Sequence, residues 1–371
     1  MNKTLSLALR LMWVSIWLAG CGNVVTPTEI PSTPILTATK QISTPTSFPT
    51  VTSIPTATST PQLLPISVEA SVYLNEALDI MQNNSLHRES IDWEALRKSA
   101  FEVAQYAQTP ADTYGAIRFA LYKLGDHHSS FHVPGQIGQV AEITANDNPP
   151  PRGKLLLEAI GFIAIEGFLG FDGDQYATNA QHLIRDIDVQ NPCGWIVDLR
   201  ENPGGNMWPM LAGIGPILGE GEVGAFVDSY GNKEIWSYRD GQAMLDGHIH
   251  NQVSEPYKLK AASPPVAVLT GVITASSGEA IAIAFRGRPN TRSFGTYTAG
   301  VPTANAPFPL SDGAVVLLTD SLDADRTGQT YGDRIYPDVI VDDVRQFTFL
   351  MDEAIPQPAI DWLMSQPACS G

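Results

Sequence analysis

The sequence predicts an α/β fold in which a small N-terminal helical subdomain precedes a core with a buried sheet. Two observations carry this prediction. Apolar residues recur at helical spacing between about residues 66 and 122, and beyond them short β-branched runs alternate with helical segments. About 300 residues lie in this folded part, which is enough for a sizeable hydrophobic core.

The first 21 residues have the pattern of an export signal. Lys3 and Arg10 give a basic start, an apolar run ends near Leu18, and small residues lead to Cys21. The ending Leu-Ala-Gly-Cys resembles the bacterial lipobox, in which the cysteine is lipidated. Because several acyl chains anchor a protein stably, we expect Cys21 to attach the protein to the extracytoplasmic face of the cell membrane. The alternative is a plain secretory signal in which Cys21 has no role.

Residues 22–65 are dominated by Ser, Thr and Pro. Such a segment has little apolar surface to offset the entropy of ordering it, so we expect a disordered linker that acts as a spacer. The net charge of −17 and the lack of a basic cluster exclude nucleic acid as an expected partner. Cys193 and Cys369 could form a disulfide, or Cys193 could be a buried free thiol. Neither a metal site nor a cofactor is indicated by the spacing of His and Cys.

Residues 66–135 are predicted to form the helical subdomain, with helices near 68–81, 93–103 and 116–124. Residues 136–345 are predicted to form the core, and residues 346–371 a C-terminal helix and tail. Strands are expected at 160–165, 195–200, 266–270, 314–319 and 339–341. Helices are expected at 177–189 and 278–286, whereas 208–218 is either a helix or a buried run.

Ser276 stands among small residues after an apolar strand and directly before a predicted helix. Free N–H groups at a helix N-terminus stabilise negative charge, so a serine there is a candidate nucleophile. The alternative is ordinary capping, because Ser276 and Glu279 satisfy the capping-box pattern without any catalytic role.

Two further segments lie at junctions of the same kind. The run from Asp198 to Asn206 ends a strand in a Gly-rich turn whose backbone N–H groups could face a ligand, although the spacing alone favours a simple turn. His127 and His128 follow the helical subdomain, and histidine is well matched to general-base work near neutral pH. Taken alone, a loop histidine is more often a surface or core residue.

Together the three segments resemble the tail-specific-protease superfamily, which includes the C-terminal-processing proteases, the tricorn core protease and the retinoid-binding repeats. The Asp-Leu-Arg-x-Asn-x-Gly-Gly turn at 198–205 and Thr-Ala-Ser-Ser-Gly-Glu at 274–279 carry the resemblance. It implies a crotonase-like/ClpP-like αββ spiral core, Ser276 as the nucleophile, and an oxyanion hole formed by the N–H groups of Ser277 and of Gly204 or Gly205.

The chain departs from the processing proteases in two ways. Val301 stands where they carry the catalytic lysine, and no lysine follows Lys260. The tricorn-like branch instead takes its base from an upstream histidine, which implies His128, with His127 as the fallback. Asp333 or Asp338 is then the expected orienting residue, acting through Ser129. Too few residues separate His128 from the strand at 160 for a peptide-binding PDZ module.

The sequence therefore predicts a serine peptidase that hydrolyses extracytoplasmic proteins or peptides, with Ser276 as nucleophile, His128 as base and Asp333 as third member. Two alternatives stay open: a non-catalytic binding protein like the retinoid-binding repeats, and an esterase or acyl hydrolase on the same fold.

Overall fold

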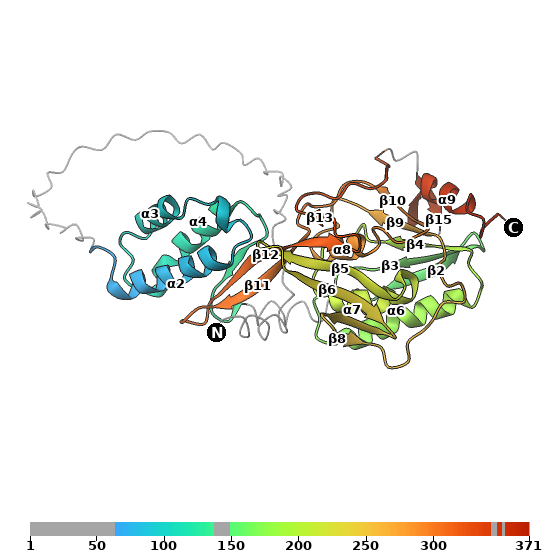
Figure 1. Cartoon of the computed structure of the whole chain (residues 1–371), viewed down its shortest axis with the longest axis horizontal. Coiled ribbons are helices and arrows are strands. Elements are labelled where there is room, and N and C mark those ends of the chain that lie inside the picture. Colours follow the sequence, from blue (N-terminus) through green and yellow to red (C-terminus); the bar gives the residue numbers. More distant parts are fainter. Residues whose placement is uncertain (1–63, 137–148, 343–346, 351–352, 371) are drawn as a thin grey trace, which may run out of the picture. The chain divides into compact units, whose positions relative to one another are not determined.

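The computed structural model describes residues 64–136, 149–342, 347–350 and 353–370 (Figure 1). Cys21 and nearly all of the predicted linker lie outside these residues. From Pro65 onward the described residues belong to one compact unit. None of their helices is both long enough and apolar enough to span a membrane.

The predicted helical subdomain is present as α2 (Val68–Asn84), α3 (Trp93–Val103) and α4 (Tyr114–Leu124). Side chains cap the first two helices, because Ser67 accepts the N–H of Ala70 and Asp92 accepts the N–H of Ala95. Gly125 ends α4 with a φ of 78°, a left-handed conformation that glycine adopts readily. The chain then turns into the segment that carries both candidate histidines.

A six-stranded sheet forms the centre of the core, in the order β14-β10-β9-β4-β3-β2. Its strands are β2 (Arg152–Leu156), β3 (Ile160–Ala164), β4 (Gly194–Asp198), β9 (Val266–Thr270), β10 (Thr291–Gly295) and β14 (Val339–Ile340). All neighbouring pairs are parallel except β2 with β3. Because β4 and β9 are adjacent and parallel, the loops that follow them meet at one edge of the sheet.

Helices cover both faces of this sheet. Residues of α6 (Gly173–Asp188), α7 (Met207–Leu218) and α8 (Ser277–Ala284) share one hydrophobic cluster with the sheet. Residues of α9 (Gln357–Met364) share another cluster with the alternate side chains of the same strands. The segment at 208–218 is therefore a helix, and the near-continuous apolar runs of the strands reflect burial on both faces.

A second, eight-stranded sheet has the order β1-β12-β5-β6-β7-β8, with β11 and β13 also paired to β12. Its strands are β1 (Ser130–His132), β5 (Gly221–Asp228), β6 (Lys233–Arg239), β7 (Gln242–Leu245), β8 (His248–Gln252), β11 (Thr303–Pro309), β12 (Val315–Asp325) and β13 (Thr330–Tyr331). Of these, the sequence analysis anticipated only the first part of β12. The strand β1 also shows that the segment before residue 136 is not purely helical.

The strands β11 and β12 connect the core to the helices (Figure 1). Their outer ends belong to the same hydrophobic cluster as α2 and α4, with Leu310, Val316 and Leu318 buried in it. Polar contacts strengthen this packing, because the hydroxyls of Tyr73 and Tyr114 both donate to the carboxylate of Asp312. The strands β11 and β12 therefore pack against the helices at their outer ends while they remain part of the eight-stranded sheet.

At the C-terminus, β15 (Phe347–Leu350) and β16 (Glu353–Pro356) form a hairpin before α9. Cys193 and Cys369 form a disulfide. This decides between the disulfide and the buried free thiol that the sequence left open. Disulfides persist in oxidising compartments, so the bond agrees with the predicted export signal.

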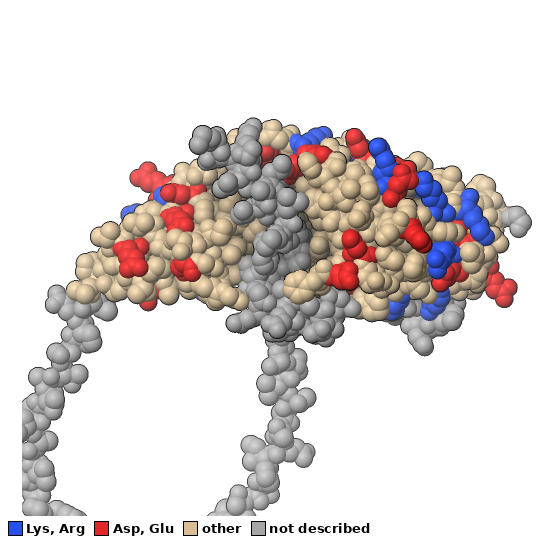
Figure 2. Space-filling view, turned by 90° about the horizontal axis from the view of Figure 1, so that it is seen from below, with Lys and Arg blue, Asp and Glu red and all other residues tan. Residues whose placement is uncertain are grey.

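The surface carries charges of both signs. On the face seen in Figure 2, Lys and Arg side chains are interspersed with Asp and Glu side chains.

Candidate active site

The turn after β4 is fixed by its own side chains. The carboxylate of Asp198 accepts from Nε and Nη2 of Arg200 at 2.9 and 2.7 Å. Asn202, which is fully buried, donates from Nδ2 to the carbonyl of Ile165 at 3.0 Å and accepts the N–H of Gly204 at Oδ1 at 2.9 Å. The motif residues thus hold the Gly-rich turn in one conformation at the end of the sheet.

The segment that follows β9 lies directly on this turn. The N–H of Ala275 donates to the carbonyl of Asn202 at 3.0 Å. A Cβ on Gly204 would lie 2.9 Å from the Cβ of Ser276, and one on Gly278 would lie 2.5 Å from the carbonyl oxygen of Asn202. Glycine is required at both positions because the two loops approach each other so closely. The structure therefore brings the two most specific sequence motifs together.

Ser276 is partly exposed at the start of α8 and has an unusual backbone, with φ 51° and ψ −119°. A non-glycine residue with positive φ is strained, and strain of this kind occurs at functional sites and at nucleophile turns. Ser276 and Glu279 occupy the capping-box positions, and the Ser276 N–H donates to Oε2 of Glu279 at 2.9 Å. The capping box expected as the alternative is therefore present, whereas the positive φ of Ser276 is a feature that N-capping does not require.

Two backbone N–H groups in these two segments have no acceptor among the described residues. They belong to Ser277, in the first turn of α8, and to Gly205. The hydroxyl of Ser277 donates to the carbonyl of Gly205 at 2.5 Å and holds the two segments together. Of the two glycines considered for an oxyanion hole, Gly204 donates its N–H to Oδ1 of Asn202, whereas the N–H of Gly205 has no acceptor among the described residues.

Glu279 connects the nucleophile segment to the loop at 298–303. Its carboxylate is fully buried and accepts from the Thr298 hydroxyl, from the N–H groups of Gly300 and Val301 at 3.0 and 2.9 Å, and from the N–H of Ser276. Burial raises the pKa of Glu279, and these four donors oppose the rise. Val301, which stands where the processing proteases are expected to carry their lysine, thus binds this carboxylate through its backbone N–H.

His128 reaches the same loop from the helical side. Its Nδ1 lies 2.6 Å from Oγ1 of Thr303, and its side chain is 3% exposed. The backbone is fixed as well, because the His128 N–H donates to Asp126 and the His128 carbonyl accepts from Nδ2 of Asn305 at 3.2 Å. Burial lowers the pKa of His128 to about 4, while the negative charge of Asp126 opposes this shift.

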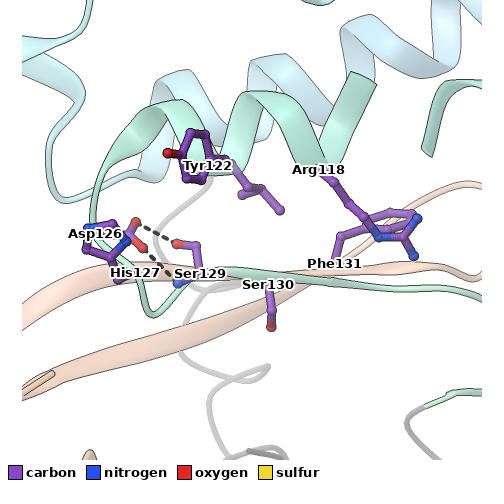
Figure 3. A pocket seen from close by; sticks show the side chains of 8 residues that line it. Arg118, Tyr122, Asp126, His127, Ser129, Ser130 and Phe131 are labelled. Carbon is purple, nitrogen blue, oxygen red and sulfur yellow. Dashed lines mark hydrogen bonds between the residues drawn. The ribbon is translucent and has the colours of Figure 1, made fainter. Parts of the chain in front are cut away.

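His127 is placed differently. It is exposed, has a φ of 56°, and lines a surface pocket with Arg118 and Tyr122 (Figure 3). Figure 3 also shows Asp126 bonded to the N–H and hydroxyl of Ser129, which closes this turn. Of the two candidate histidines, only His128 is held against β11.

The two acidic residues expected to orient the base, Asp333 and Asp338, have their own local contacts. Asp338 binds Arg286 and the hydroxyl of Ser293, at 2.9 and 2.8 Å, in a structural role. The carboxylate of Asp333 accepts the N–H of its neighbour Arg334 at 2.7 Å. The side chain that contacts Nδ1 of His128 is the hydroxyl of Thr303, a residue that the sequence analysis did not single out.

Asp323 is a second residue that sequence reasoning missed. It is 1% exposed on β12, and its Oδ1 has no hydrogen-bond partner among the described residues. Burial, together with the charge of nearby Glu279, raises the pKa of Asp323 well above its ordinary value. An acidic residue at a buried strand position was the available signal, but the sequence analysis ended this strand at residue 319.

The Gly-rich turn and the serine loop thus follow two adjacent parallel strands, β4 and β9. A sequence model of peptidase family S41 matches residues 159–341. The chain belongs to this family. The 19 residues between β1 and β2, 133–151, leave no room for a PDZ module at that point.

Three relatives illustrate the likeness. The chain is 29% identical to the Nisin-resistance protein of Lactococcus lactis subsp. lactis over 297 residues, 79% of this chain and 87% of that protein. A lipoprotein from Streptococcus agalactiae has a solved structure with 26% identity and a TM-score of 0.64, covering 81% of this chain and 97% of the other. The photosystem II D1 C-terminal processing protease matches in fold, with 17% identity and a TM-score of 0.55 over 74% and 94% of the two chains.

Proposed function

We propose that this S41 family member is a serine-type peptidase in which Ser276 is the nucleophile and His128 is the base. One observation supports the proposal: the loop at 298–303 contacts His128 directly and is linked to Ser276 through the carboxylate of Glu279. Val301 shares the carboxylate of Glu279 with the Ser276 N–H, and Thr303, two residues later, contacts the ring of His128. Residues from the helical subdomain and the core are thus held by one short segment.

The chemistry follows from these groups. Ser276 Oγ attacks the peptide carbonyl, and its proton passes to His128, which is neutral at pH 7 because burial lowers its pKa to about 4. The N–H groups of Ser277 and Gly205 stabilise the oxyanion, each by roughly 3–4 kcal/mol in comparable sites. His128 then protonates the leaving amine. Water hydrolyses the resulting acyl-enzyme and restores the Ser276 hydroxyl.

We place the substrate, a peptide or protein, outside the cytoplasm. The Cys193–Cys369 disulfide supports this location because such bonds persist in oxidising compartments. The relative from Streptococcus agalactiae is a lipoprotein, which supports the proposed lipid anchor at Cys21 and attachment to the cell membrane. The relative from Lactococcus lactis is called a nisin-resistance protein, so nisin is the first substrate to test.

The experiment is hydrolysis of nisin and of a peptide library by the wild-type protein and two variants, Ser276→Ala and His128→Gln. We expect both variants to lose activity by a factor of at least about 1000, because triad members act as a unit. Ser99→Ala is the matched control, since Ser99 lies on α3 and its hydroxyl only donates to the Ala95 carbonyl.

Other outcomes point to the alternative functions. Full activity of Ser276→Ala would exclude Ser276 as the nucleophile. Hydrolysis of esters but not peptides would indicate an acyl hydrolase. Binding of peptides without cleavage by the wild-type protein would indicate a binding protein.

A further inference from the structure

The group in contact with the ring of the proposed base is a hydroxyl. Oγ1 of Thr303 lies 2.6 Å from Nδ1 of His128, at the start of β11. The neighbouring carboxylate, Asp126, is occupied by the backbone N–H groups of His128 and Ser129 and by the Ser129 hydroxyl. We propose that Thr303 is a positioning residue that orients His128 by accepting its Nδ1–H. This inference rests on the proposed function.

Thr303 is well fixed for this role. Its N–H donates to the carbonyl of Val301 at 2.8 Å, and it is paired with Leu322 in the register of β11 and β12. Val301 is in turn bound to the carboxylate of Glu279 at 2.9 Å. The same carboxylate holds the N–H of Ser276. A shift of the Thr303 hydroxyl would therefore require a shift of the segment that also positions the nucleophile.

A second hydrogen bond fixes the backbone of His128 to the same strand. Asn305, two residues beyond Thr303 on β11, donates to the backbone carbonyl of His128 at 3.2 Å. The ring and the backbone of His128 thus contact the same strand, at residues 303 and 305. This arrangement leaves the buried ring little freedom to rotate, since its side chain is 3% exposed.

The orientation has a chemical consequence. A neutral imidazole carries one proton, on Nδ1 or on Nε2, and the hydrogen bond to one nitrogen decides which. When the Thr303 hydroxyl accepts from Nδ1–H, the lone pair lies on Nε2, which is the form that can take a proton from Ser276. If the hydroxyl donated to Nδ1 instead, Nε2 would carry the proton and His128 could not act as the base.

The role of Thr303 can be tested by nuclear magnetic resonance without any substrate. In the full chain with 15N-labelled histidine, the His128 ring signals are assigned by their loss in His128→Gln. We expect the proton on Nδ1 in the wild-type protein and in Thr303→Ser, and a shift of the proton toward Nε2 in Thr303→Val. A wild-type ring protonated on Nε2, or an unchanged tautomer in Thr303→Val, would overturn the inference.

Kinetics supply the second readout. Thr303→Val keeps the shape of the side chain and removes the hydroxyl, and we expect kcat to fall roughly 10- to 100-fold with KM changed less than about twofold. Thr303→Ser should restore kcat to within about threefold of wild type. Thr178→Val on α6, whose hydroxyl donates to Asp174 of its own helix, is the control. Thr303→Val with wild-type kcat would contradict the inference.

Failure of this inference is distinguishable from failure of the proposed function. If Ser276→Ala or His128→Gln keeps full activity, the proposed function fails whatever Thr303 does. If those two variants are inactive while Thr303→Val is fully active, the peptidase remains and only the orienting role of Thr303 is refuted. The tautomer of the wild-type ring is informative even if Thr303→Val does not fold.

Discussion

The disulfide between Cys193 and Cys369 should contribute a large share of the stability. It joins residues 176 positions apart, so it closes most of the core into one loop. The chain-entropy relation for a loop of this length gives a stabilisation of about 5 kcal/mol at 25 °C. Ordinary proteins have unfolding free energies of about 5–15 kcal/mol. Loss of this bond is therefore expected to remove a substantial fraction of the unfolding free energy.

The native packing should survive this loss. Ala359, Ile360 and Leu363 of α9 are buried in the cluster that covers one face of the six-stranded sheet. The helix therefore stays docked without the bond, and the effect acts mainly through the unfolded state. We expect Cys193→Ala/Cys369→Ala to fold to the same structure with an unfolding free energy lower by about 2–5 kcal/mol.

The assay is urea unfolding of the oxidised wild-type protein, the reduced wild-type protein and the double variant. The reduced protein and the double variant should agree with each other, and both should unfold at lower urea concentration than the oxidised protein. A difference below about 1 kcal/mol between the oxidised protein and the double variant would refute the reasoning.

Two further predictions concern the site. Gly204→Ala should lower the unfolding free energy by roughly 1–3 kcal/mol and abolish activity, because φ is +104° and the new Cβ would lie 2.9 Å from the Cβ of Ser276. Gly231→Ala is the control for backbone strain alone, since Gly231 has a φ of +81° and open space around it. An equal loss of activity in both variants would contradict the argument. Stability should also fall as the pH drops from about 6.5 toward 4, because the pKa of His128 is lowered from 6.5 to about 4 and the unfolded chain binds the proton more readily in that window. Urea unfolding at several pH values measures this loss of unfolding free energy. At about 1.4 kcal/mol per pKa unit, the loss between pH 6.5 and 4 should be about 3 kcal/mol smaller in His128→Gln than in the wild-type protein. An equal dependence of the unfolding free energy on pH in the two proteins would contradict the burial of a neutral ring.

The meeting of the two main motifs was predictable from the sequence. Asp198 ends one buried apolar strand, and Ser276 follows another, so a parallel sheet brings both loops to one edge. The helices were predictable for a similar reason, since their apolar residues recur with the period of a helix.

Other features carried weaker signals. The strand β6 has its buried Trp236 and Tyr238 at alternate positions, a two-residue period that the sequence analysis did not use. Thr303 offered no signal at all, because a threonine at the start of a strand is common. Its contact with His128 joins residues 175 positions apart, and only the folded chain reveals such a pair.

The assignment of the nucleophile depends on the reactivity of one hydroxyl. A fluorophosphonate probe, followed by mass spectrometry of the digested protein, measures that reactivity directly. We predict a single adduct on Ser276, absent in Ser276→Ala and formed much more slowly in His128→Gln. No adduct on the wild-type protein, or an adduct on Ser277 instead, would contradict the account.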